Sequence, residues 1–92
     1  MSEKVVQRVW EKAKVGGSTL VVLLLLANLA DDHGYVEIGY RLNAVAKQAH
    51  MDVKTLKETL VKLERVGEIR EVTTGVYQIL TGRTIGTMTK PD

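Results

Sequence analysis

The chain has 92 residues, of which 45% are hydrophobic and 26% are charged. This length fits one domain with a single small core, and the balance is typical of globular rather than disordered proteins. Because the chain contains no cysteine, disulfide bonds and thiolate metal sites are excluded. The formal net charge is +2, which permits binding to nucleic acid without indicating it.

The N-terminal part of the sequence predicts two helices. Over residues 3–13, apolar side chains recur every three or four positions, which is the pattern of an amphipathic helix. Gly16-Gly17 is expected to end this helix. We expect Ser18 or Thr19 to cap a second helix that runs to about Ala30.

The second helix contains an apolar run, LVVLLLLA, over residues 20–27. A helix that spans a bilayer needs about 20 apolar residues, and Asn28 and Asp31-Asp32 close this shorter run, so membrane insertion is not expected. A helix that is apolar on most of its faces is expected at the centre of a fold or at a subunit interface. Residues 1–4 include an early acid and no apolar segment, so a signal peptide is not expected.

Short segments follow the second helix. Residues 31–34 are expected to form a polar turn, with Gly34 in the left-handed conformation. Residues 35–38 alternate between apolar and polar and predict a short strand. A third helix is expected over about residues 41–49, followed by a tight turn at His50-Met51.

The fourth helix is predicted over residues 53–66, with Asp52 as its N-cap and Gly67 at its C-terminal end. Residues 68–80 contain two short alternating runs, which predict two strands joined by a tight turn at Thr73-Thr74-Gly75. We expect one domain over residues 1–80 and a C-terminal tail, rich in Thr and Gly, over residues 81–92.

This order of elements predicts a mainly α fold with a small β-hairpin wing, of the α+β class. Four stretches also carry a family pattern: residues 22–34 (VLLLLANLADDHG), 42–47 (LNAVAK), 51–56 (MDVKTL) and 60–69 (LVKLERVGEI). They resemble the winged helix-turn-helix domains of phage and plasmid replication initiators and small prokaryotic regulators. His50 and Asp52 stand where that family has a turn glycine and a serine cap. Ile38-Gly39-Tyr40 replaces the Trp-Pro-Ser segment that is frequent in it.

The resemblance implies a protein that binds double-stranded DNA, in the cytoplasm of a prokaryote and associated with the nucleoid or a plasmid. Its role would be regulation of transcription, plasmid or viral replication, or partition. The alternative is a protein-protein interaction module that uses the same fold without DNA. Near-neutral charge, Glu58 and the exposed position of Val61 favour that alternative.

Enzymatic activity, a cofactor and a metal site are not expected. The sequence contains no glycine-rich phosphate loop, no nucleophile elbow and no zincin motif. Five residues carry groups that are able to bind a metal, without a recognised spacing: Asp31, Asp32, His33, Glu37 and His50.

In a helix-turn-helix, the N-terminal half of the second helix of the motif enters the major groove. The predicted DNA-contacting residues are Lys54, Thr55, Lys57 and Glu58 near bases and phosphates, Lys62 and Arg65 at phosphates, Lys47, Gln48 and His50 around the turn, and Arg70, Thr73 and Thr74 on the wing. Charged side chains are also common on any solvated helix face, so this expectation depends on the flanking motif.

A homodimer is expected, with Val5, Val9 and Trp10 at its interface. The reason is that the second helix is too apolar for one small helix and a sheet edge to cover. A two-fold dimer would present two recognition helices about one DNA turn apart. The alternative is that these three residues cover the second helix within one domain.

Overall fold

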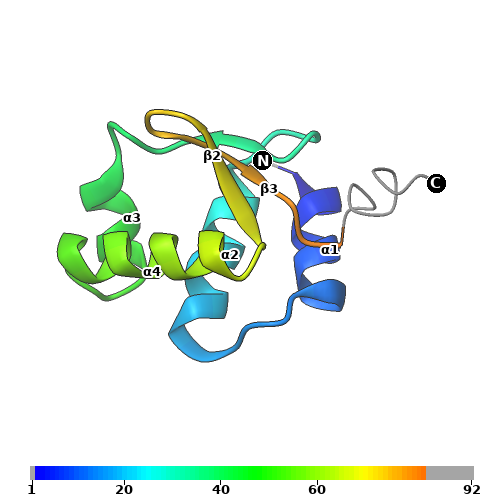
Figure 1. Cartoon of the computed structure of the whole chain (residues 1–92), viewed down its shortest axis with the longest axis horizontal. Helices are drawn as coiled ribbons and strands as arrows, with labels where there is room; N and C mark the ends of the chain where they lie inside the picture. The colour runs from blue at the N-terminus through cyan, green and yellow to red at the C-terminus, as the bar shows by residue number, and fades with distance from the viewer. Residues whose placement is uncertain (1, 83–92) are drawn as a thin grey trace.

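Four helices and a three-stranded antiparallel sheet make up the computed structural model (Figure 1), which describes residues 2–82. The elements are α1 (Glu3–Lys12), α2 (Gly17–Leu29), β1 (Tyr35–Glu37), α3 (Leu42–Gln48), α4 (Val53–Arg65), β2 (Ile69–Thr73) and β3 (Val76–Ile79). The expected α+β class and the expected order of elements are confirmed. Of the predicted tail, residues 83–92 lie outside the described residues.

The first two helices form an antiparallel pair, in which α1 lies at one end of the molecule and α2 lies between α1 and α4 (Figure 1). Ser2 caps α1 by accepting a hydrogen bond from the backbone N–H of Val5 at 3.1 Å. The cap predicted for α2 is wrong, because the helix begins at Gly17 and its N-cap Gly16 offers no side chain. Thr19 is buried in the fold instead, where it cannot cap the helix.

The turn at residues 49–52 joins α3 to α4 and sets the direction of α4. His50 has a φ of +58°, in the left-handed region, at the position where the resembled family has glycine. Asp52 caps α4 as predicted, because its carboxylate accepts from the backbone N–H of Thr55 at 2.7 Å. Gly67 ends the helix with a φ of +85°, and its N–H donates to the carbonyl of Glu64 at 3.1 Å.

The sheet has the order β1-β3-β2, so the short strand β1 pairs with the last strand and not with its neighbour in sequence. Only Thr74 and Gly75 lie between the paired residues of the β2–β3 hairpin, because Thr73, predicted to be part of the turn, pairs with Val76. The carbonyl of Gly75 accepts from the backbone N–H groups of Ile38 and Gly39, at 2.8 and 3.2 Å. The hairpin turn is thereby fixed against the segment that precedes α3.

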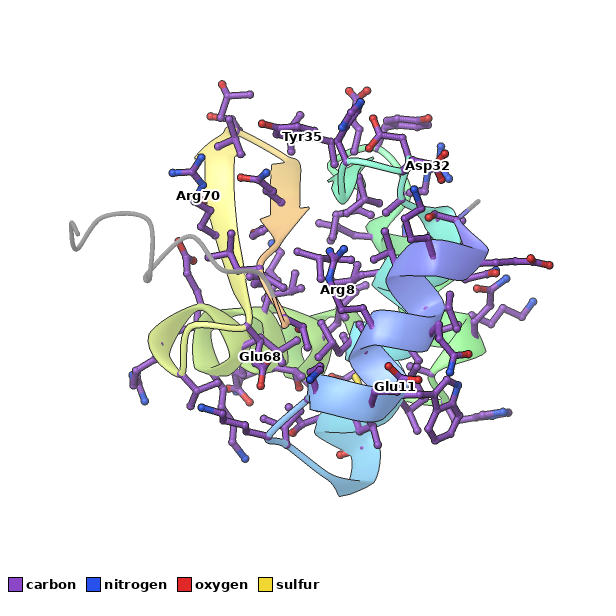
Figure 2. All side chains as sticks on the ribbon, turned by 90° about the vertical axis from the view of Figure 1, so that its right-hand side faces the viewer. Arg8, Glu11, Asp32, Tyr35, Glu68 and Arg70 are labelled. Carbon is purple, nitrogen blue, oxygen red and sulfur yellow. The ribbon has the colours of Figure 1, made fainter. Side chains whose placement is uncertain are left out.

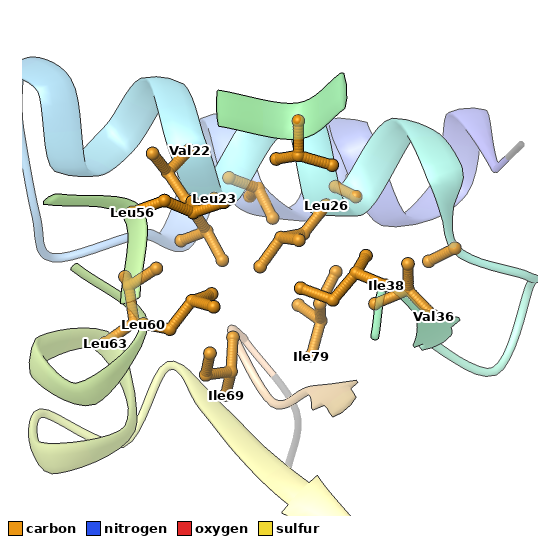
Figure 3. Packing of buried hydrophobic residues seen from close by; sticks show 14 of the residues in the cluster. Val22, Leu23, Leu26, Val36, Ile38, Leu56, Leu60, Leu63, Ile69 and Ile79 are labelled. Atoms are coloured by element: carbon orange, nitrogen blue, oxygen red, sulfur yellow. The ribbon is translucent and has the colours of Figure 1, made fainter. Parts of the chain in front are cut away.

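The core lies between α2, α4 and the inner face of the sheet (Figure 3). Its largest fully buried side chains include Leu23 and Leu26 from α2, Leu56 and Leu63 from α4, and Ile38, Ile69 and Ile79 from the sheet and the residue after β1. The 3.6-residue period of α4 and the two-residue period of the strands direct these side chains inward. Among the described residues, no helix combines the length and the apolar character needed to cross a bilayer.

A buried polar cluster connects α1 to the hairpin. Glu68 is only 5% exposed, and its carboxylate accepts from the backbone N–H of Lys14 at 2.7 Å and from the hydroxyl of Thr81 at 2.6 Å. Arg8 reaches from α1 toward the hairpin (Figure 2), where its Nε donates to the carbonyl of Thr81 at 2.6 Å. Thr81, expected at the start of the tail, therefore belongs to the folded region.

Candidate functional site

The outer face of α4 carries four of the basic side chains that the sequence predicted to contact DNA, and all four are exposed. We define this α4 face as Lys54, Lys57, Glu58, Val61, Lys62 and Arg65, all of which are exposed. The opposite side of the helix buries Leu56, Leu60 and Leu63 in the core. Because the helix has 3.6 residues per turn, anchoring that apolar stripe fixes the α4 face toward solvent.

The start of α4 is rigidly defined by its cap. The hydrogen bonds that Thr55 makes to the Asp52 carboxylate lower the pKa of Asp52 below its usual value. One turn later, the hydroxyl of Thr59 donates to the carbonyl of Thr55 at 2.9 Å. The side chains of Lys54 and Thr55 are exposed on this first turn.

Acidic groups near α4 are of two kinds. Glu58 is exposed within the α4 face itself, one turn after Lys54. Glu64 is directed to the hairpin, where its carboxylate accepts from the backbone N–H of Glu71 at 3.3 Å. The α4 face therefore holds one carboxylate, from Glu58, among four cationic side chains.

The turn residues lie beside the start of α4. Lys47 and Gln48 occupy the last positions of α3, and His50 follows them in the turn; all three are exposed. These three side chains are exposed to solvent, and in the sequence they precede Lys54 and Thr55 by a few residues. The predicted turn residues therefore lie at the end of α3 and in the turn that leads directly into α4.

Only part of the predicted wing lies on the side of the hairpin that faces α4. Thr73 and Thr74 are exposed at the hairpin turn. Arg70 alternates with the inward-facing Ile69 and lies on the outer face of the sheet, where its Nε donates to Gln78 at 3.0 Å. Figure 2 shows Arg70 on this outer face, which is the side of the sheet away from the core and α4.

A groove separates α4 from the hairpin. It encloses about 320 Å³ and is lined by Leu42, Leu60, Val61 and Tyr77, with Lys57 and Glu71 at its polar positions and further residues from the hairpin turn. Partial burial raises the pKa of Tyr77, and the negative charges of Glu71 and Glu64 raise it further. Tyr77 therefore stays neutral throughout the physiological range.

Two residues that the sequence did not single out lie next to the hairpin turn. Tyr40 is 71% exposed, and the guanidinium of Arg41 lies 4.9 Å from its ring centroid and bonds to its hydroxyl. The preceding residue, Gly39, approaches Gly75 so closely that a Cβ on Gly39 would lie 3.2 Å from the Gly75 Cα. The sequence shows that Arg41 directly follows an aromatic residue, Tyr40. Only the pairing of β1 with β3 places these two residues beside the hairpin.

The predicted dimer interface is wrong for two of its three residues. Val5 and Val9 have no exposed surface, because they fill the contact between α1 and α2 within one chain. Trp10, at the edge of the same apolar stripe, is 63% exposed. Of these three residues, only Trp10 is accessible to a second chain without opening the core.

Two of the residues considered for metal binding, Asp31 and Asp32, have other roles. Asp31 closes the turn before β1, since its carboxylate accepts from the backbone N–H groups of His33 and Tyr35 at 2.9 and 3.0 Å. Asp32 accepts from the hydroxyl of Ser2 at 2.9 Å. Within residues 2–82, no three His, Asp or Glu side chains gather as a metal-binding group.

Comparisons of the chain with protein-family models, with curated proteins and with solved structures found no match.

Proposed function

We propose that this chain binds double-stranded DNA through a winged helix-turn-helix, in which α3 and α4 form the motif and the β2–β3 hairpin forms the wing. The observation that carries the proposal is the α4 face, where Lys54, Lys57, Lys62 and Arg65 are exposed on a helix anchored at its opposite side. An α-helix with its side chains is about 10–12 Å wide, which matches the major groove of B-DNA.

In this proposal, the first turn of α4 meets the base edges. Lys54 and Lys57 are suited to guanine or to phosphates, and Glu58 accepts from the N4 amino group of cytosine. Lys62 and Arg65 lie one to two turns further along and neutralise phosphates. Lys47, Gln48 and His50 contact the backbone from the turn.

The hairpin supplies a second contact region. Thr73 and Thr74 are exposed at its tip, and the Tyr40-Arg41 pair lies beside that tip. The guanidinium of Arg41 is suited to a phosphate oxygen, and the threonine hydroxyls are suited to the sugar-phosphate backbone. These contacts would fix the orientation of α4 without reading sequence.

The test compares two double variants of equal charge. We expect Lys54→Ala with Lys57→Ala to reduce the slope of log K against log salt concentration by about 2, because two phosphate contacts are lost. The matched control is Lys12→Ala with Lys14→Ala, which removes two exposed lysines from the end of α1 and the residues after it. Fluorescence anisotropy with a labelled duplex at several salt concentrations gives both slopes, and thermal melting checks that both variants fold.

Two results would contradict DNA binding by α4. The first is no binding of any duplex at low salt. The second is an equal loss of affinity in the two double variants, which would indicate general charge attraction. If neither result is found, selection from a random oligonucleotide pool identifies the target sequence. The position of that sequence at a plasmid, viral or chromosomal site then separates regulation of transcription from replication or partition.

A second candidate function is supported by the groove between α4 and the hairpin. Its apolar lining, with Val61 53% exposed at its edge, fits an apolar side chain of a protein partner. The variant Val61→Lys discriminates the two functions. It retains or strengthens duplex binding if the α4 face meets DNA, and it abolishes binding if the face meets an apolar partner.

A further inference from the structure

One surface of the molecule remains apolar and lies outside the α4 face. It is formed by α2, which carries no charged residue along its whole length, and by the neighbouring edge of α1. On α2, Val21 is 45% exposed, and Leu24, Leu25 and Asn28 follow it on the same side at helical spacing. We call these four residues, with Val6 and Trp10 of α1, the α1–α2 surface.

The α1–α2 surface combines a protruding side chain with a hollow. Trp10 is 63% exposed, and beside it lies a hollow of about 650 Å³ lined by Ser2, Glu3, Val6, Gln7, Trp10 and Asn28. Polar atoms of Gln7 and Asn28 at this hollow are suited to accept a hydrogen bond from an indole N–H. A knob and a hollow that offers hydrogen-bond acceptors therefore lie on the same surface.

We infer that the occupant of this surface is a second copy of the chain, related by a two-fold axis, with Trp10 of each copy inserted into the hollow of the other. A two-fold interface requires a surface that is complementary to itself, and an adjacent knob and hollow meet that requirement. The inference rests on residues of α1 and α2 alone and does not depend on DNA binding.

The charges of α1 fit the same arrangement. Lys4 and Glu11 are exposed beside the hollow, separated by about two helical turns. When two α1 helices run antiparallel about a two-fold axis, Lys4 of each copy approaches Glu11 of the other. The uncharged surface of α2 meets its own equivalent at the same time, so α2 contributes no charge to the interface.

The extent of the surface sets the expected affinity. With 10 and 13 residues, α1 and α2 are about 15 and 20 Å long, so together they offer an area on the order of 400 Å². Standard stable interfaces bury about 800 Å² per partner. The dimer is therefore expected to dissociate in the micromolar range, and the measurement has to extend over that range of concentrations.

Trp10 is the single tryptophan of the chain, so its fluorescence reports directly on this surface. As protein concentration rises without DNA, we expect the mass from sedimentation equilibrium to increase from 10.2 kDa toward twice that value. The tryptophan emission maximum should shift to shorter wavelength over the same range. A mass that stays at 10.2 kDa would overturn the inference, as would doubling of the mass without an emission shift.

Variants locate the interface. Trp10→Ala and Val21→Glu are both expected to shift the dissociation constant upward by at least about tenfold. The control Tyr40→Ala removes an equally exposed aromatic at the hairpin end of the molecule and should leave the constant unchanged. Circular dichroism melting establishes that each variant folds, and Trp10→Ala serves alone if the introduced charge unfolds α2. An unaltered dissociation constant in Trp10→Ala would overturn the inference.

Discussion

Glu58 is the residue that most sharply distinguishes sequence-specific from general DNA binding. It is exposed on the α4 face one turn after Lys54, and a carboxylate at that position repels phosphates. The same carboxylate is useful where a cytosine amino group meets it in the major groove. The carboxylate of Glu58 should therefore weaken binding to DNA of general sequence and strengthen binding to a target sequence with cytosine at that position.

We expect Glu58→Gln to raise the affinity for mixed-sequence duplex by about fivefold, because removing one unit of repulsion near a phosphate contributes about 1 kcal/mol. On a selected target sequence, the same variant should bind more weakly. Anisotropy titrations with both duplexes measure the two effects. The control is Glu37→Gln, which changes the net charge equally at an exposed position of β1, and identical behaviour of the two variants would refute a role for Glu58.

At the scale of elements, α4 is positioned by its cap and by the polar cluster that ends it. Asp52 fixes the first turn through the backbone N–H of Thr55. At the other end, Glu68 follows Gly67 and joins β2 to Lys14 and Thr81. The direction of α4, and with it the orientation of the α4 face, depends on both ends.

The Asp52 cap predicts a specific dependence of stability on acid. Because hydrogen bonds lower the pKa of Asp52 in the folded state, its ionised form stabilises the fold above the usual pKa of 3.8. That contribution is lost as the pH falls through the lowered pKa. We expect Asp52→Ala to melt a few degrees below the parent at pH 7, with a difference that shrinks below pH 3.8. A difference that is independent of pH would contradict the ionic cap.

Removing the buried carboxylate of Glu68 should lower the stability of the fold more than removing the Asp52 cap. Glu68→Ala leaves the backbone N–H of Lys14 and the hydroxyl of Thr81 without their acceptor, so we expect the free energy of unfolding to fall by about 2–3 kcal/mol. Urea denaturation measures this change, with Glu37→Ala as an exposed control expected within about 0.5 kcal/mol of the parent. A Glu68→Ala variant as stable as that control would show that the cluster is not stabilising.

At the scale of the whole molecule, the two proposed surfaces lie on different elements. The α1–α2 surface and the α4 face share no residue, so self-association leaves α4 free. A two-fold dimer would then present two α4 helices to one duplex.

This arrangement predicts that DNA with two half-sites is bound cooperatively. We expect Trp10→Ala to bind a single half-site with unchanged affinity and to lose the additional affinity for a pair of half-sites one helical turn apart. Mobility-shift titrations with one-site and two-site duplexes give the comparison. Loss of single-site affinity in Trp10→Ala would instead place Trp10 in the DNA contact itself.

The sequence by itself determined the features that depend on neighbouring residues. The helices followed from the 3.6-residue period, and the cap at Asp52 and the left-handed Gly34 and Gly67 followed from local backbone chemistry. The exposure of the α4 face also followed from the sequence, because an apolar stripe on a helix fixes which side chains point away from the core. These interactions span at most a few residues, so the sequence pattern records them.

Only the tertiary structure decided which segments meet. It paired β1 with β3 and brought Arg41 to the hairpin. It also buried Val9 while leaving Trp10 exposed at the edge of the same helical stripe. Each of these outcomes depends on contacts between residues distant in sequence, whose packing overrides local preference, and no periodicity along the chain encodes them.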